Sequence, residues 1–81
     1  MNTTQLECFV TVAECLNFSK AAVSLMMTQP AVSHQIRSLE EELEVKLFRR
    51  TSKNVSLTQE GLLFLADAHL ILKTALTARK R

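Results

Sequence analysis

The sequence predicts a mainly α-helical fold in a single small domain. The chain has 81 residues, enough for one modest hydrophobic core. It contains one glycine and one proline, and its only aromatic residues are four phenylalanines. Leucine, valine, alanine and isoleucine dominate the apolar content, which argues against an all-β fold and favours helices with very short connections.

A first helix is predicted to begin near Thr4, because Thr4 and Glu7 have the spacing of a capping box. One face of this helix is apolar at helical spacing and is expected in the core: Leu6, Phe9, Val10, Ala13 and Leu16. A second apolar face consists of Cys8, Val12 and Cys15. We expect part of the last helix to pack on this second face.

The two cysteines predict neither a disulfide nor a metal site. Cys8 and Cys15 lie two helical turns apart, about 10 Å along the axis, which is beyond disulfide reach. No cluster of histidine and cysteine accompanies them, and the sequence indicates no cofactor. We expect two small buried thiols in a reducing compartment, and a cytoplasmic protein.

The segment NFSKAAVSL predicts a second, short helix. Ser19 can cap this helix, and Phe18 and Val23 have the spacing of a hydrophobic staple around it. The paired alanines, Ala21 and Ala22, have two explanations: another helix approaches closely, or alanine is simply the best helix former. The sequence leaves both explanations open.

A third helix is predicted to start at Thr28, a good N-cap, with Pro30 in its first turn, where a missing N–H costs nothing. Its buried face recurs at intervals of four, three and four residues: Val32, Ile36, Leu39 and Leu43. Only Met26 and Met27 lie between the second helix and Thr28. Two short helices joined by so tight a turn predict a helix-turn-helix unit.

The segment LFRRTSKNVSLT predicts a small β-hairpin, or wing. Two short apolar pieces, around Phe48 and at Val55 and Leu57, flank a polar stretch of four residues, 51–54. The net charge is only +2, but this region is basic and free of acid: Lys46, Arg49, Arg50 and Lys53. Four glutamates come just before it: Glu40, Glu41, Glu42 and Glu44. A basic patch therefore lies beside an acidic one.

A long last helix is predicted after Thr58, which can cap it. This helix is apolar over most of its circumference, with Leu63, Leu70 and Ile71 on one side, so we expect a second copy of the chain to cover part of it. The expected dimer-interface residues are Leu62, Leu65, Ala66, His69, Leu72 and Leu76. Asp67 interrupts the apolar run, which argues against a membrane span.

The polar face of the third helix predicts contact with DNA. A helix amino terminus presents free N–H groups to phosphate, and its first turns fit a major groove about 12 Å wide. Gln29 suits adenine, Arg37 suits guanine or phosphate, and Ser33 can bond several bases. His34 can donate to guanine, and Pro30 can contact a thymine methyl group. The alternative is a solvated helix face with ordinary surface charge at its other end.

Five segments, in order, resemble the N-terminal domain of LysR-type transcriptional regulators: LECFVTVAE, NFSKAAVSL, TQPAVSHQIRSLEEEL, KLFRRT and VSLTQEG. The resemblance covers essentially the whole chain. It implies a winged helix-turn-helix, with three helices plus a small β-hairpin wing, followed by a long linker/dimerisation helix. In this family the linker helix pairs with that of a second subunit, and full-length assemblies are often tetramers.

The resemblance also implies roles for single residues in binding a double-stranded DNA operator. The implied DNA-binding residues are Thr28, Gln29, Pro30, Ser33, His34, Arg37, Arg50, Thr51 and Lys53. Lys53 matches a wing position at the minor groove, whereas Arg50 and Thr51 match positions that contact phosphate. Residues 1–58 would form the DNA-binding domain and residues 59–81 the linker helix, and the C-terminal inducer-binding domain, which binds a small molecule, is expected to be absent from this chain.

Two residues depart from the family pattern. Glu44 stands where the family usually has glycine after the third helix, and a left-handed cap there would cost roughly 1 kcal/mol. This leaves open where the helix ends. His34 occupies a position that is often arginine, so its base preference cannot be copied from relatives.

One alternative function is a helical dimerisation or protein-interaction module with only generic DNA affinity, which the apolar last helix favours. An enzyme is not expected, because the sequence offers no pair of nucleophile and base, no phosphate loop and no metal-ligand spacing.

Overall fold

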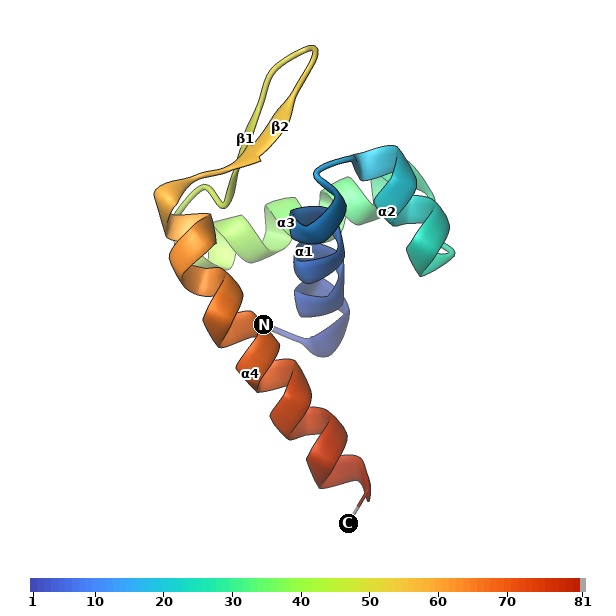
Figure 1. Ribbon diagram of the computed structural model, residues 1–81, viewed down its shortest axis with the longest axis vertical. Coiled ribbons are helices and arrows are strands. Elements are labelled where there is room, and N and C mark those ends of the chain that lie inside the picture. The colour runs from blue at the N-terminus through green and yellow to red at the C-terminus, as the bar shows by residue number, and fades with distance from the viewer. Residues whose placement is uncertain (81) are drawn as a thin grey trace.

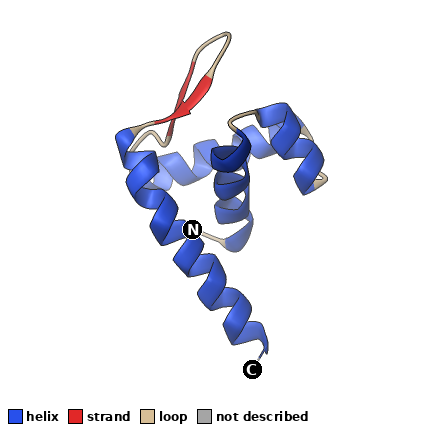
Figure 2. Ribbon diagram, viewed as in Figure 1, coloured by secondary structure: helices blue, strands red, loops and turns tan. Residues whose placement is uncertain are grey.

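The computed structural model describes residues 1–80, and this part of the chain forms four helices and one two-stranded antiparallel hairpin (Figures 1 and 2). In chain order the elements are α1 Thr3–Cys15, α2 Phe18–Leu25, α3 Gln29–Leu43, β1 Phe48–Arg50, β2 Val55–Leu57 and α4 Gln59–Lys80. The predicted fold class is confirmed. Figure 1 shows the hairpin projecting at the opposite end of the molecule from the C-terminal part of α4.

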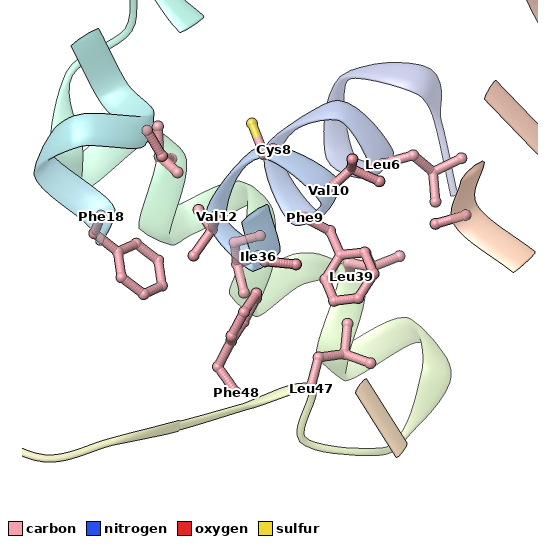
Figure 3. Packing of buried hydrophobic residues seen from close by; sticks show 14 of the residues in the cluster. Leu6, Cys8, Phe9, Val10, Val12, Phe18, Ile36, Leu39, Leu47 and Phe48 are labelled. Atoms are coloured by element: carbon pink, nitrogen blue, oxygen red, sulfur yellow. The ribbon is translucent and has the colours of Figure 1, made fainter. Parts of the chain in front are cut away.

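The core lies where α1 meets α3, the base of the hairpin and α4. Phe9 of α1 is fully buried between two other rings, with centroid distances of 5.5 Å to Phe48 and 5.4 Å to Phe64. Figure 3 shows Phe9 beside Leu39 of α3, with Leu47 below them. Because these side chains come from four different elements, packing around Phe9 holds the hairpin and α4 to the helix-turn-helix unit.

Two of the four predicted helix starts are correct. The Thr28 hydroxyl accepts from the Ala31 N–H at 3.2 Å, and the Thr58 hydroxyl accepts from the Gly61 N–H at 3.0 Å. Each side chain satisfies a backbone donor that has no partner within its helix. The turn before α3 is also as predicted, since only Met26 and Met27 separate α2 from Thr28.

The other two predicted starts, at Thr4 and Ser19, are wrong. The capping box of α1 uses Asn2, whose side chain accepts from the Gln5 N–H at 2.8 Å, while the Gln5 side chain accepts from the Asn2 N–H at 3.0 Å. In α2 the cap is Asn17, which accepts from the Lys20 N–H at 2.9 Å. The expected staple partner of Phe18, Val23, is 79% exposed, so no staple forms.

Three helices end on a residue other than glycine with left-handed backbone: Leu16 at φ 49°, Met26 at φ 55° and Glu44 at φ 58°. Glu44 therefore caps α3 in the conformation that glycine adopts most readily, and the helix ends where the family pattern places its end. The Val45 N–H then donates to the Glu40 carbonyl oxygen at 3.2 Å, which closes the turn.

The second apolar face of α1 does not meet the last helix as predicted. Buried Cys8 contacts Met27 in the turn between α2 and α3, with 3.7 Å between the two sulfur atoms, and Cys15 is exposed rather than buried. Burial, and then the charge of Glu7, raise the pKa of the Cys8 thiol. Both cysteines are free, as the spacing predicted. The last helix packs instead on the face that carries Phe9.

Helix α4 leaves most of its length outside the core. Ala68 is fully buried, and Phe64 is partly buried against the core. From Gln59 to Arg79 the helix is long and apolar enough to cross a membrane, by length and composition alone. A single helix that meets these criteria is weak evidence for a membrane span. The placement of Phe64 and Ala68 gives part of this apolar content a role in packing on α1.

Candidate nucleic-acid interface

The polar stripe predicted on α3 lies on one face of the helix. Gln29, Pro30, His34 and Arg37 are exposed, and Ser33 is half-buried. The stripe faces outward because the opposite side of α3 carries the buried residues Val32, Ile36 and Leu39. The first three turns of α3 therefore present amide, hydroxyl, imidazole and guanidinium groups without an acidic side chain among them.

The glutamates of α3 lie at its other end, but one of them is not a surface charge. Glu41, Glu42 and Glu44 are exposed, whereas Glu40 is 8% exposed. A Glu40 carboxylate oxygen accepts from the Leu47 N–H at 2.7 Å and from the Phe48 N–H at 3.3 Å. The interpretation of Glu40 as ordinary surface charge is wrong, because the Glu40 carboxylate holds the beginning of β1 to the end of α3.

The hairpin carries the predicted wing residues. Its strands pair Arg49 with Ser56 and Arg50 with Val55. At its tip the Thr51 N–H donates to the Asn54 carbonyl oxygen at 2.8 Å, and the Thr51 hydroxyl oxygen accepts from the Asn54 N–H at 3.0 Å. Thr51 thus shapes the turn, a role that the sequence interpretation missed, and this turn holds Lys53 exposed at the tip.

Arg50 connects the wing with both helices of the helix-turn-helix unit. Its guanidinium carbon lies 3.9 Å from the ring centroid of Phe18, and its Nη1 is 3.5 Å from the Ser33 hydroxyl oxygen. Partial burial lowers the pKa of the Arg50 guanidinium, Glu40 opposes this change, and Arg37 adds to it. Arg37 and Arg50 are thus two cations near the same stretch of α3, and their combined positive charge favours binding of an anion there.

A groove of about 510 Å³ lies between the wing and the first turns of α2 and α3. Its lining residues are Leu16, Asn17, Phe18, Ser19, Gln29, Arg50, Thr51, Ser52, Lys53, Asn54 and Val55. The charged members of this lining, Arg50 and Lys53, are both basic. The groove therefore joins the polar stripe of α3 to the basic wing, and its charge suits a polyanion.

Ser19 belongs to this site, although the sequence interpretation used it only as a helix cap. Its hydroxyl donates to the Oε1 atom of Gln29 at 2.9 Å. No periodicity or spacing along the chain predicts this contact, since it depends on how α2 and α3 cross.

The predicted dimer residues divide into two groups. Leu62, Ala66, His69 and Leu76 are exposed. Leu65 and Leu72 are partly buried against the core of their own chain, so they are less available to a second copy. Leu63 and Leu70, which are not among the predicted dimer residues, are 69% and 63% exposed. We refer to Leu62, Leu63, Ala66 and Leu70 as the free apolar face of α4.

Residues 3–62 match the sequence profile of the bacterial regulatory helix-turn-helix proteins of the lysR family. The chain belongs to the lysR family. This confirms the family that its motifs resemble. Separately, residues 1–80 contain no group of three or more histidine, cysteine, aspartate or glutamate side chains that could hold a metal ion.

Similar proteins support this family membership. The chain is 47% identical over 73 residues to the hydrogen peroxide-inducible genes activator of Pectobacterium carotovorum subsp. carotovorum, covering 90% of this chain and 24% of that protein. The chain spans 24% of the length of this relative, and likewise of AlsR of Bacillus subtilis and of the hydrogen peroxide-inducible genes activator of Dickeya chrysanthemi. By their names these relatives are an activator of genes and a transcriptional regulator.

Two solved structures of LysR-family DNA-binding domains have the same fold. The CbnR domain, solved in complex with DNA, superposes with a TM-score of 0.95 at 38% identity, covering 100% of this chain and 93% of that chain. The BenM domain, solved in complex with catB site 1 DNA, gives 0.92 at 39% identity, covering 99% and 90%. The winged helix-turn-helix prediction is therefore confirmed.

Proposed function

We propose that this chain binds double-stranded DNA sequence-specifically as a dimer, with α3 in the major groove and the wing at the minor groove. The observation that carries the proposal is the acid-free polar stripe on the first turns of α3, next to a groove whose charged side chains are basic. The LysR-family domains of CbnR and BenM, which share its fold, were solved with DNA. A binding role, rather than catalysis, accounts for these features.

In this proposal the exposed side chains of α3 read bases. Gln29, Pro30, Ser33 and His34 face the major groove, and Arg37 contacts guanine or phosphate. The stripe lies within the first three turns of α3, which matches the part of a recognition helix that reaches base edges in a helix-turn-helix protein.

The wing and the start of α3 supply contacts that hold the protein on the duplex. Lys53 enters the minor groove from the tip of the hairpin. Arg50 and Thr51 contact phosphate, and Thr28 lies near the DNA backbone. The guanidinium of Arg50 is already held by Phe18, so little conformational freedom is lost when it meets a phosphate.

A second copy of the chain covers the exposed apolar residues of α4 in the dimer. Residues 1–58 form the DNA-reading unit and α4, Gln59–Lys80, the linker helix, while Arg81 of the predicted linker lies outside the described residues. We place the protein in the cytoplasm, where bacterial DNA lies. A small-molecule inducer and tetramer formation belong to the longer protein that the family implies.

The test is selection from a pool of random duplex DNA at a stated salt concentration, followed by sequencing. The purified chain runs beside a Gln29→Ala, Ser33→Ala double variant. The control is Thr4→Ala, which removes an exposed hydroxyl from α1, outside the proposed interface. The chain and its control should enrich one site with inverted half-sites, and the double variant should lose the preference at the bases it reads.

Salt-sensitive binding without enrichment, equal in all three proteins, would mean that α3 does not read sequence. That result would favour the alternative function, a dimerisation module with generic DNA affinity, for which the exposed leucines of α4 are the specific evidence.

A further inference from the structure

We infer that Ser19 is a positioning residue for Gln29, so that the base preference of the first residue in α3 depends on a hydroxyl in α2. This inference rests on the proposed function. Its basis is one contact between two helices: the Ser19 hydroxyl donates to Gln29 Oε1 at 2.9 Å. Both residues line the groove between α2, α3 and the wing.

Close packing of α2 on α3 brings these two side chains together. Ala21 is fully buried and Ala22 is 5% exposed, so two small side chains lie in the middle of the buried face of α2. The Met27 N–H donates to the Ala22 carbonyl oxygen at 2.9 Å, which closes the turn between the helices. The burial of both alanines favours close helix approach as one reason for their presence, beside their helix-forming tendency.

The Ser19 hydroxyl is available for this role because another residue caps α2. The Asn17 side chain accepts from the Lys20 N–H at 2.9 Å and caps the helix, so the Ser19 hydroxyl is not used as an N-cap. Ser19 and Gln29 are both exposed, and a neutral hydrogen bond between exposed groups adds little to folding stability. A functional effect on Gln29 fits this contact better than a structural one.

The contact restrains the position of the Gln29 amide, and in the structure Oε1 is the atom that faces Ser19. A glutamine amide carries an acceptor on Oε1 and two donors on Nε2, and rotation by a half turn exchanges them. With Oε1 held toward α2, the Nε2 donors point elsewhere, and within residues 1–80 they have no protein acceptor. Adenine presents an acceptor and a donor in a fixed order in the major groove, so only one amide orientation matches it.

Fixing the amide before binding also lowers the entropy lost when the base is contacted. Without the hydroxyl of Ser19, Gln29 would lose this restraint and sample other rotamers. It would still reach the groove, but it would discriminate less among bases. The expected effect is therefore confined to one base position and leaves the remaining preferences intact.

The experiment repeats the selection with Ser19→Ala, Ser19→Thr and Ser24→Ala, alone and combined with Gln29→Ala. The position read by Gln29 is the one whose preference disappears in Gln29→Ala. Ser19→Ala should lower the preference there by about fivefold, the typical worth of one neutral hydrogen bond. Ser19→Thr, which keeps a hydroxyl, should restore it. Ser24→Ala, an exposed serine of the same helix, should change nothing.

The combined variants decide between a positioning role and a direct phosphate contact. Ser19→Ala should have no further effect once Gln29 is alanine. Equal weakening at every position, persisting in the Gln29→Ala background, would show that Ser19 holds phosphate instead and would overturn the inference, as would an unchanged preference in Ser19→Ala. If the unaltered chain enriches no site, the proposed function fails first, and the two failures are thus distinguishable.

Discussion

At the scale of single residues, the three left-handed helix ends are the most unusual feature. An L-residue with a side chain pays roughly 1 kcal/mol or more for this backbone conformation, whereas glycine does not. Leu16, Met26 and Glu44 all adopt it. Glu44 is exposed at the acidic end of α3, far along the helix from the polar stripe, so its replacement tests the backbone cost without changing the proposed DNA contacts.

Glu44→Gly should raise the free energy of unfolding by about 1 kcal/mol, because the left-handed cap becomes unstrained. Urea denaturation measures this change as a higher midpoint at constant slope. The matched control is Glu41→Gly, an exposed glutamate within α3, where glycine should lower stability by about 0.5–1 kcal/mol. A loss of stability in both variants would contradict the interpretation of Glu44 as a strained cap.

The helix caps show how far single residues can be predicted from sequence. Thr28 and Thr58 were predicted correctly because proline and a glutamate mark the first turns that follow them. Thr4 and Ser19 were wrong because Asn2 and Asn17, two residues earlier in each case, cap equally well. Serine, threonine and asparagine differ little as N-caps, so tertiary packing decides among neighbours.

At the scale of elements, Glu40 joins the recognition helix to the wing. Its carboxylate accepts hydrogen bonds from the backbone N–H groups of Leu47 and Phe48 at the start of β1. Without Glu40 these two N–H groups would be buried without a partner. The sequence held a signal for this role: Glu40 follows Ile36 by four residues and therefore lies on the buried face of α3. That signal was obscured by the three other glutamates around it.

Glu40→Ala should lower the free energy of unfolding by about 2 kcal/mol, the usual cost of losing hydrogen bonds to a buried charged group. Amide hydrogen exchange should accelerate most at Leu47 and Phe48, whose N–H groups lose their acceptor. The exposed neighbour Glu41 provides the control, since Glu41→Ala should change stability by less than about 0.5 kcal/mol. Equal effects of the two substitutions would remove Glu40 from this role.

The elements themselves could be predicted, but the faces of α4 could not. Apolar spacing, caps and the charge pattern were enough to place four helices and a hairpin. In α4 almost every side is apolar, so periodicity does not say which leucines pack inside the chain. The small residues Gly61 and Ala68, both buried, mark the side that approaches the core and could have identified it.

At the scale of the whole molecule, the proposed dimer contact depends on the free apolar face of α4. Leu63 and Leu70 are separated by two helical turns and lie away from the partly buried Leu65 and Leu72. So much exposed apolar surface in a domain of this size favours association. The dimer contact is therefore expected around Leu63 and Leu70, a shift around the helix from the residues predicted from sequence.

Leu70→Lys should weaken dimer formation by at least tenfold in Kd, because each copy would bury a charge in place of a leucine. Sedimentation equilibrium of the purified chain measures this, and circular dichroism should show an intact fold. Ser24→Lys adds the same charge at an exposed site outside α4 and should leave the Kd unchanged. An unaltered dimer in Leu70→Lys would place the contact elsewhere.

The start of α4 is fixed to the base of the wing. A side chain at Gly61 would overlap the Leu47 carbonyl oxygen, and the Thr58 N–H donates to that same oxygen at 3.0 Å. With Phe64 packed on Phe9, α4 cannot turn independently of the reading unit. In a dimer, the angle between the two linker helices would therefore set the distance between the two reading units. A change in that angle would alter the spacing of the two half-sites on DNA.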